Sequence, residues 1–170
     1  YSGDPNNNFK IRIIADDNTA GGSTCPGVAT VEYEGQTYNT IQIGNQCWLK
    51  ENLNVGNRVL GSDNQTNNGI IEKYCMDDME VLCNTYGGFY QWAEAVQYLN
   101  GASNNTPPNP EFSGNVKGIC PEGWHIPTNA ETQTLIDAIG GLNNSANRIK
   151  AVGQGSDIGA GTNTSGFSAL

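Results

Sequence analysis

The fold is decided by one stretch of twelve residues, Cys120-Pro121-Glu122-Gly123-Trp124-His125-Ile126-Pro127-Thr128-Asn129-Ala130-Glu131. Pro121 and Gly123 favour a tight turn at its start, because proline presets a turn backbone and glycine tolerates positive φ. Thr128 followed three residues later by Glu131 is a capping box, in which each side chain hydrogen-bonds the other residue's backbone N–H. The sequence therefore predicts a turn followed by a helix that begins after Thr128.

The residues on either side of this helix start complete the local pattern. Pro127 holds the backbone at the entry to the helix, and Trp124 is expected to be buried beneath the turn. The helix should end at Gly140-Gly141, because glycine is the residue most often found just past a helix C-terminus.

Two further elements have clear periodicity. Val28 to Tyr33 and Gln36 to Ile43 are rich in β-branched and aromatic residues around Glu34-Gly35, which predicts a β-hairpin. Residues 88 to 99 carry apolar side chains at spacings of three and four, which predicts a second helix. This apolar stripe contains Phe89, Trp92, Ala93, Val96 and Leu99.

The remaining segments are less regular. Phe9 to Ala15 alternate as a strand, with Lys10 and Arg12 on one face and apolar residues on the other. Segments 54–84 and 143–164 are rich in Asn, Gly, Asp and Ser and are expected to be loops, with Ile70-Ile71 as the apolar anchor of the first.

Together with the hairpin, several of these segments carry a family resemblance. They are Tyr33 to Trp48, Glu51-Asn52-Leu53, Tyr86 to Trp92, Cys120 to Glu131 and Ser165 to Leu170. In order and spacing they resemble the Fibrobacter succinogenes major paralogous domain, found in bacterial surface and secreted proteins. The signature residues are Trp48, Trp92, Trp124, His125, Pro127, Thr128 and Glu131.

The resemblance implies a domain organisation and a fold. It covers roughly residues 25–170, so residues 1–24 are expected to be an N-terminal strand and linker that belongs to a preceding domain or wraps onto this one. In the family, further strands follow the Gly-Phe-Ser-Ala-Leu step, which implies that the domain is C-terminally truncated here or completed by another chain. The element order is similar to the C-type lectin-like fold and its formylglycine-generating relatives. The expected class is α+β, with two helices packed on a small, mostly antiparallel sheet with long loops.

The five cysteines suggest two local disulfides. Cys75 and Cys83 close a short loop, and Cys25 and Cys47 bracket the predicted hairpin. Loop-closure entropy would make these bridges worth about 2.5 and 3.4 kcal/mol. Cys120 is then a buried thiol or has a partner outside this chain; the alternative is that all five are reduced core residues.

Composition limits the partners. The net charge is −9, with only eight Lys and Arg, which argues against nucleic acid and anionic membrane surfaces, because both bind clustered positive charge. No apolar run of about 18 residues that could span a membrane occurs. The sequence shows no initiator Met and no signal peptide. If the protein is exported, Tyr1 is expected to be either the first residue after processing or the first residue of a segment taken from a longer chain.

Candidate chemistry is sparse. His125, the only histidine, is a general base or, as we favour, a structural hydrogen-bonding residue. A glycosidase pair would need Glu94 and Glu131, yet Glu131 is already explained by the helix cap. Asp77, Asp78 and Glu80 are the best calcium candidates, and the alternative is a solvated acidic loop; the Asp16-Asp17-Asn18 turn has the same two interpretations. No other cofactor is expected.

Aromatic residues offer one further hypothesis. Five aromatic side chains could offer their rings to a sugar as a stacking platform. The alternative, which we favour, is that they pack in the core. They are Tyr74, Tyr86, Tyr90, Trp92 and Tyr98.

Three function classes follow. The first is a non-enzymatic module of the cell surface or extracellular space for adhesion or carbohydrate binding. The second is a structural subunit of an extracellular filament or pilus, in which the strand edges near 9–15 and 166–170 pair with copies of the same chain. An enzyme related to formylglycine generation is third, because its sulfur chemistry requires a reactive Cys pair or a copper site that no motif here specifies.

Overall fold

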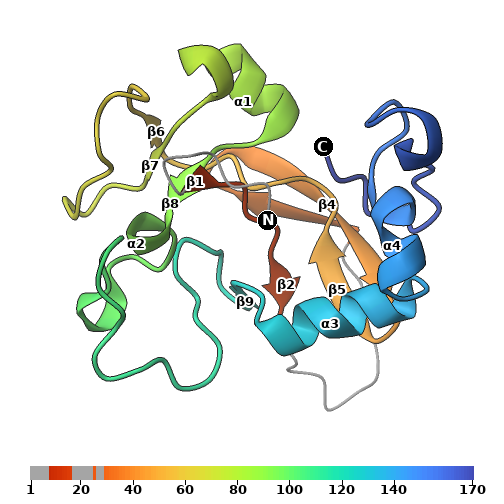
Figure 1. Ribbon diagram of the computed structural model, residues 1–170. Coiled ribbons are helices and arrows are strands. Elements are labelled where there is room, and N and C mark those ends of the chain that lie inside the picture. Colours follow the sequence, from red (N-terminus) through yellow and green to blue (C-terminus); the bar gives the residue numbers. More distant parts are fainter. Residues whose placement is uncertain (1–7, 17–24, 26–28) are drawn as a thin grey trace.

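The computed structural model describes residues 8–16, 25 and 29–170. The predicted linker at 17–24, the first residues of the N-terminal segment and Val28 at the start of the hairpin lie outside this part of the chain. Among the described residues the fold is α+β (Figure 1), with four α-helices rather than the two expected from the sequence.

A five-stranded antiparallel sheet forms the centre of the molecule, in the order β3-β4-β5-β2-β9. Its strands are β3 (Thr30–Tyr33), β4 (Gln36–Ile43), β5 (Gln46–Leu49), β2 (Ile14–Ala15) and β9 (Trp124–His125). Two small sheets accompany it: β1 (Asn8–Phe9) pairs antiparallel with β8 (Tyr90–Gln91), and β6 (Asn57–Arg58) pairs parallel with β7 (Glu72–Lys73). The mostly antiparallel sheet predicted from the sequence is therefore confirmed.

The helices lie on two sides of this sheet (Figure 1). α1 (Glu80–Tyr86) and α2 (Trp92–Ala95) belong to the part formed by residues 54–118, whereas α3 (Asn129–Ala138) and α4 (Leu142–Ile149) lie on the other side. Three short 3₁₀ helices complete the described elements, at Met76–Asp78, Leu99–Gly101 and Asp157–Gly159.

The predicted hairpin is confirmed, with Glu34 and Gly35 as its two-residue turn. Both residues have positive φ, 48° and 73°, the conformation that joins twisted antiparallel strands most closely. Its second strand continues through a turn at Gly44 into β5, a strand that the sequence interpretation did not separate.

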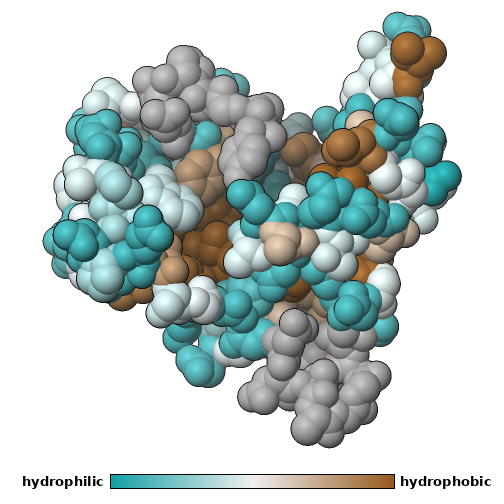
Figure 2. Space-filling view, turned by 60° about the horizontal axis from the view of Figure 1, so that its bottom comes forward, coloured by the Kyte–Doolittle hydropathy of each residue, from teal (hydrophilic) through white to brown (hydrophobic). Residues whose placement is uncertain are grey.

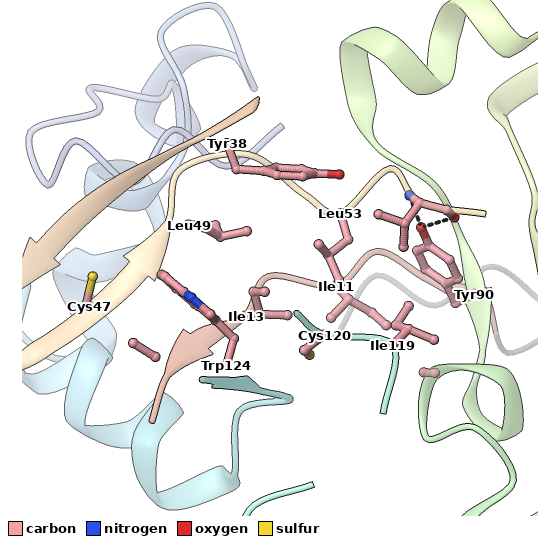
Figure 3. Packing of buried hydrophobic residues seen from close by; sticks show 13 residues of the cluster. Ile11, Ile13, Tyr38, Cys47, Leu49, Leu53, Tyr90, Ile119, Cys120 and Trp124 are labelled. Atoms are coloured by element: carbon pink, nitrogen blue, oxygen red, sulfur yellow. Dashed lines mark hydrogen bonds between the residues drawn. The ribbon is translucent and has the colours of Figure 1, made fainter. Parts of the chain in front are cut away.

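The strands β2 and β5 are buried on both faces, so successive residues of each strand face different cores. Ile13 and Leu49 face one core, which Figure 3 shows closing around Tyr38, Leu53, Ile119 and Trp124. Their neighbours Ile14 and Trp48 face a second core, formed with Leu135 and Ile139 of α3 and with Phe167. The sheet thus separates two cores, and α3 covers the second.

The first strand wraps onto the domain and is not an edge. Ile14 pairs with Trp48 on one side and with His125 on the other. Near the C-terminus, Ala169 exchanges backbone hydrogen bonds with Ile149 and Ala151. At Ile14 the predicted edge is therefore already occupied by β5 and β9, while Ala169 is paired with the end of α4 on one side; pairing of these segments with copies of the chain stays a prediction.

Arg12 links the first strand to the last residues of the chain. Its guanidinium donates to the carbonyl oxygens of Phe167 and Ser168 and lies 4.3 Å from the centre of the Phe167 ring. Burial lowers the pKa of Arg12, and the negative charge of Glu51 partly opposes this effect, so that the pKa is about 10. Arg12 nevertheless stays cationic at neutral pH and holds residues 167–168 against the sheet.

Three sequence expectations about helices and loops need correction. The helix expected at 88–99 is reduced to α2, because Tyr90 and Gln91 pair with β1 and because Gln97 and Tyr98 take positive φ, 53° and 52°. α1 and α4 form in segments 54–84 and 143–164, which were expected to be loops. Of the expected anchor Ile70-Ile71, Ile70 is 52% exposed, whereas Ile71 packs against the first core; Val55 and Tyr74 add buried contacts.

Candidate functional site

The predicted capping box is present at the start of α3. Thr128 Oγ1 accepts the backbone N–H of Glu131 at 3.3 Å, and Glu131 Oε2 accepts the backbone N–H of Thr128 at 2.8 Å. Upstream, Trp124 is buried, as expected, and donates its backbone N–H to Pro121 across the predicted turn. At the other end, Gly140 and Gly141 have positive φ and follow the last turn of the helix.

Replacing Thr128 by alanine should lower the free energy of unfolding by about 1 kcal/mol, because the first turn of α3 loses its side-chain acceptor. Urea denaturation measures the change. Thr134→Ala is the control, since Thr134 lies within the same helix and bonds only the Ala130 carbonyl. Equal midpoints for Thr128→Ala and the parent protein would contradict the assigned cap.

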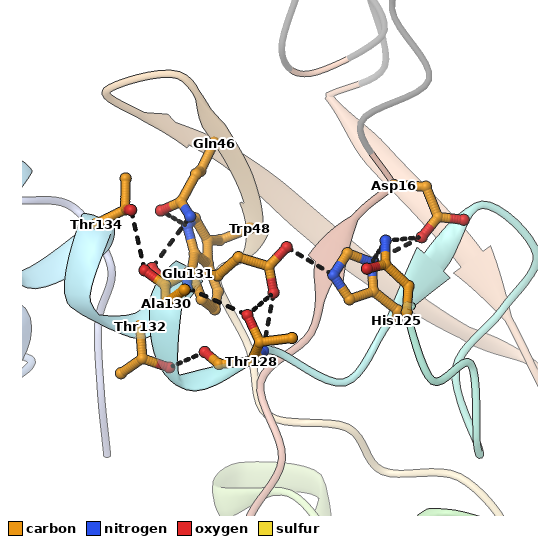
Figure 4. Close-up of polar contacts among 10 residues, drawn as sticks. Asp16, Gln46, Trp48, His125, Thr128, Ala130, Glu131, Thr132 and Thr134 are labelled. Carbon is orange, nitrogen blue, oxygen red and sulfur yellow. Dashed lines mark hydrogen bonds and ion pairs between the residues drawn. The ribbon is translucent and has the colours of Figure 1, made fainter. Parts of the chain in front are cut away.

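His125 lies between two carboxylates beneath α3 (Figure 4). Its Nδ1 is 2.6 Å from Asp16 Oδ1 and its Nε2 is 2.8 Å from Glu131 Oε1, while the side chain is only 1% exposed. A carboxylate accepts but does not donate, so both contacts are hydrogen bonds only when both ring nitrogens carry a proton. The two contacts tie β9 to the end of β2 and to α3, and Asn115 Nδ2 also lies 3.2 Å from His125 Nδ1.

The polar cluster continues from Glu131 to the sheet. Gln46 donates to the Glu131 carbonyl at 3.0 Å and accepts the indole N–H of Trp48 at 3.3 Å. Burial raises the pKa of Glu131, but the hydrogen bonds from Thr128 and His125 outweigh it and hold this pKa below its usual value. Every strong contact of His125 and Glu131 thus serves the junction of sheet and helix, which supports the structural interpretation of His125.

The other signature residues differ in exposure. Trp48 is buried and packs edge-on against Phe167 at 5.7 Å between ring centres, and Pro127 is half-buried beside the helix start. Trp92 is 37% exposed and lies between the rings of Phe9 and Phe112, at 6.3 and 6.2 Å. The five aromatic residues proposed as a platform do not share one surface, because Tyr74 and Tyr90 are buried in the core.

The acidic loop does not assemble a calcium site. Glu80 Oε1 is 2.9 Å from the ammonium of Lys73, and Asp78 Oδ1 accepts the backbone N–H of Gly61 at 2.8 Å. No group of three or more His, Cys, Asp or Glu side chains that could hold a metal ion occurs in the described part of the chain. Of the three calcium candidates Asp77, Asp78 and Glu80, two thus have partners within the protein. Of the Asp16-Asp17-Asn18 turn, only Asp16 is described, and it contacts His125.

Both predicted disulfides are present, Cys25–Cys47 and Cys75–Cys83. Cys120 is a free, buried thiol. Burial raises the pKa of Cys120, and the negative charge of Asp16 adds to this effect. The thiol therefore stays protonated at neutral pH, the less reactive form of cysteine.

Glu94 is a buried carboxyl group whose place the sequence did not reveal. It is 1% exposed; Oε1 accepts the backbone N–H of Glu72 and the amide of Gln97, each at 3.1 Å. Oε2 and the neighbouring Tyr98 hydroxyl have no hydrogen-bond partner of good geometry among the described residues. Burial raises the pKa of Glu94, and the hydrogen bonds from Glu72 and Gln97 and the nearby Tyr98 hydroxyl only partly oppose this effect.

Replacing Glu94 by glutamine should stabilise the protein at neutral pH. The pKa of Glu94 is higher in the folded than in the unfolded state. The free energy of unfolding therefore falls as pH rises from the unfolded-state pKa to the folded-state pKa, by about 1.4 kcal/mol for every unit between the two. Glutamine keeps Oε1 as an acceptor and removes that loss. Urea midpoints of Glu94→Gln and parent should coincide near pH 3 and diverge towards pH 7. A less stable Glu94→Gln protein at pH 7 would refute this account.

A pocket lies over α4, away from the signature turn. It has a volume of about 650 Å³, within the range of small-molecule sites. Buried Ile43 and Ile139 provide apolar contacts. Its lining comes from β4, the end of α3, α4 and the loop 162–165: Gln42, Ile43, Ala138, Ile139, Asn143, Asn144, Asn147, Arg148, Thr162, Thr164 and Ser165.

Hydrogen bonds fix the loop wall of this pocket to α4. Thr162 donates its backbone N–H to the Asn147 carbonyl at 2.8 Å, and the Ser165 hydroxyl donates to the Arg148 carbonyl at 2.7 Å. Asn147 in turn donates to the Ile158 carbonyl at 2.6 Å. The walls are thus amides and hydroxyls on supported backbone. Sequence periodicity did not find this site, since its residues come from four separate segments, and those after residue 142 lie mostly in a region expected to be loop.

Among the described residues, no helix is long and apolar enough to cross a membrane. No curated protein and no solved structure matches the chain. A family model does match, the Fibrobacter succinogenes major domain, over residues 41–170. This match covers most of the sequence, including β5, the four α-helices and every residue that lines the pocket, and the chain therefore belongs to the Fibrobacter succinogenes major domain family.

Proposed function

We propose that the protein is a non-enzymatic, extracellular surface module that binds carbohydrate at the pocket over α4. The observation that carries this proposal is the lining of that pocket. Three asparagines of one helix face it together with Thr162, Thr164 and Ser165, above the apolar side chains of Ile43 and Ile139. Amides and hydroxyls hydrogen-bond sugar hydroxyl groups, and apolar contacts receive the faces of the ring.

Location and fold type support the same proposal. Two disulfides persist best in an oxidising compartment, such as the outside of a bacterial cell. The resemblance of the sequence to C-type lectin-like domains adds an analogy of fold, which by itself does not fix function. The engaged His125 and the protonated Cys120 offer no obvious nucleophile or base, which favours binding over catalysis.

A glycan array tests the proposal. We expect the parent protein to bind a defined set of glycans and Asn143→Trp to lose this binding, because Asn143 is exposed, makes no side-chain hydrogen bond and lines the pocket. Asn129→Trp is the matched control, since Asn129 is exposed in the first turn of α3, outside the pocket. Absence of glycan binding by the parent, or equal binding by both variants, would contradict it.

A second candidate is the filament or pilus subunit. The observation that favours it is the exposure of Leu142, Val152 and Ile158, at 73, 76 and 97%. Figure 2 shows hydrophobic atoms at the tip of a protrusion at the upper right of that view. Sedimentation over a range of concentrations distinguishes the two: ordered polymers without glycan binding would favour the subunit, and a monomer that binds glycans would favour the surface module.

A further inference from the structure

The charge of the pocket over α4 is opposite to that of the whole molecule. The chain carries 17 Asp and Glu against eight Lys and Arg, yet no acidic residue lines the pocket and Arg148 is its only charged residue. The acidic residues nearest in sequence, Asp137 and Asp157, are not in the lining; Asp137 accepts a hydrogen bond from Gln133 instead. Arg148 is therefore the charged side chain that the lining itself contributes.

Arg148 has hydrogen-bonding capacity left over. Its Nη1 donates to the Ile139 carbonyl at 3.0 Å, at the end of α3. Among the described residues, it forms no salt bridge, and its Nε and Nη2 form no hydrogen bond. These two nitrogens make up the side edge of the guanidinium, the pair of parallel donors that fits a carboxylate.

We infer that the pocket binds a saccharide bearing a carboxylate, such as a uronic or sialic acid, with the carboxylate on Nε and Nη2 of Arg148. This inference rests on the proposed function and adds the class of sugar. The bond from Nη1 to the end of α3 holds the guanidinium in place before the ligand arrives. The asparagine and threonine side chains then bind the sugar hydroxyls, and a carboxylate is favoured over a neutral group because Arg148 has no anionic partner of its own.

The experiment compares glycans that end in galacturonic, glucuronic or sialic acid with the same glycans as methyl esters. We expect the parent protein to bind at least one acidic glycan at least tenfold more tightly than its ester, and this preference to shrink as salt is raised. Binding of neutral glycans and methyl esters as tightly as the acids would overturn the inference while leaving the proposed function intact. Absence of binding to every glycan would overturn both.

Two variants test whether the preference for acidic glycans arises in this pocket. Asn143→Asp puts a carboxylate into the lining without breaking a hydrogen bond, and acidic residues are favourable in the first turn of a helix, so the fold should be retained. We expect it to weaken acidic-glycan binding at least tenfold, and the control Asn129→Asp, with the same change at the start of α3, to bind like the parent. Arg148→Lys keeps the positive charge but loses the pair of parallel donors, so it should reduce the preference for the acidic glycan over its methyl ester. Equal binding by Asn143→Asp and Asn129→Asp would refute the assignment.

Discussion

Replacing His125 by alanine is expected to lower the free energy of unfolding by about 3 kcal/mol. The substitution removes a buried ring whose two nitrogens contact Asp16 and Glu131, leaving two carboxylates without this partner. Breaking a buried ion pair from one side typically costs about 3–5 kcal/mol. The lower end applies here because the Asp16 side chain is 39% exposed and water compensates part of the loss. Urea denaturation measures the change directly.

The control for His125→Ala is a substitution that breaks a solvent-exposed ion pair. Lys117 and Glu122 are 2.9 Å apart, with side chains 56 and 93% exposed, so Lys117→Ala should change stability by less than about 0.5 kcal/mol. A His125→Ala protein as stable as Lys117→Ala would show that the contacts beneath α3 contribute little.

A pH series gives a second view of the same junction. The pKa of Glu131 is lowered in the folded protein, so its contribution to stability is present above the unfolded pKa and lost as pH falls through the folded one. Removing His125 removes one of the causes of that lowering. The parent should therefore lose more stability than His125→Ala on acidification below about pH 4.5, the ordinary value for a glutamate.

Local signals in the sequence predicted those elements that depend on neighbouring residues. Thr128 and Glu131 form a cap three residues apart, and Glu34-Gly35 join two strands directly, so both patterns contain their own partners. The two disulfides were also predictable, because each closes a short loop. The family match over residues 41–170 agrees with the resemblance read from the signature residues.

Elements whose partners are distant in sequence were not predictable in this way. α2 is short because Asn8 and Phe9 pair with residues more than 80 positions away, and no window around Trp92 contains that information. α4 forms in an Asn-rich segment of weak helix propensity because Ile149 packs into the second core. The contacts of His125 with Asp16 and the pocket over α4 arise in the same way, from segments that only the folded sheet brings together.

Removal of the Cys25–Cys47 disulfide should have an effect of similar size to His125→Ala. The bond spans 22 residues and Cys75–Cys83 spans 8, so loop-closure entropy predicts losses of about 3.4 and 2.5 kcal/mol for the two double alanine variants. Cys47 lies in β5, within the first core, whereas the second bridge, which is also buried, joins α1 to the residue before the 3₁₀ helix Met76–Asp78. The Cys25→Ala/Cys47→Ala protein should thus be the less stable of the two.

Reduction provides the independent check on this prediction. Dithiothreitol should lower the urea midpoint of the parent below that of either double variant, because it opens both bridges, and it should leave a variant without any of these four cysteines unchanged. Cys120→Ala serves as the control for thiol chemistry, since Cys120 is buried and unpaired and its loss should not alter the response to the reductant. If Cys75→Ala/Cys83→Ala were the less stable protein, the short bridge would hold more of the fold than its loop length implies, and chain entropy would not be the main source of stabilisation.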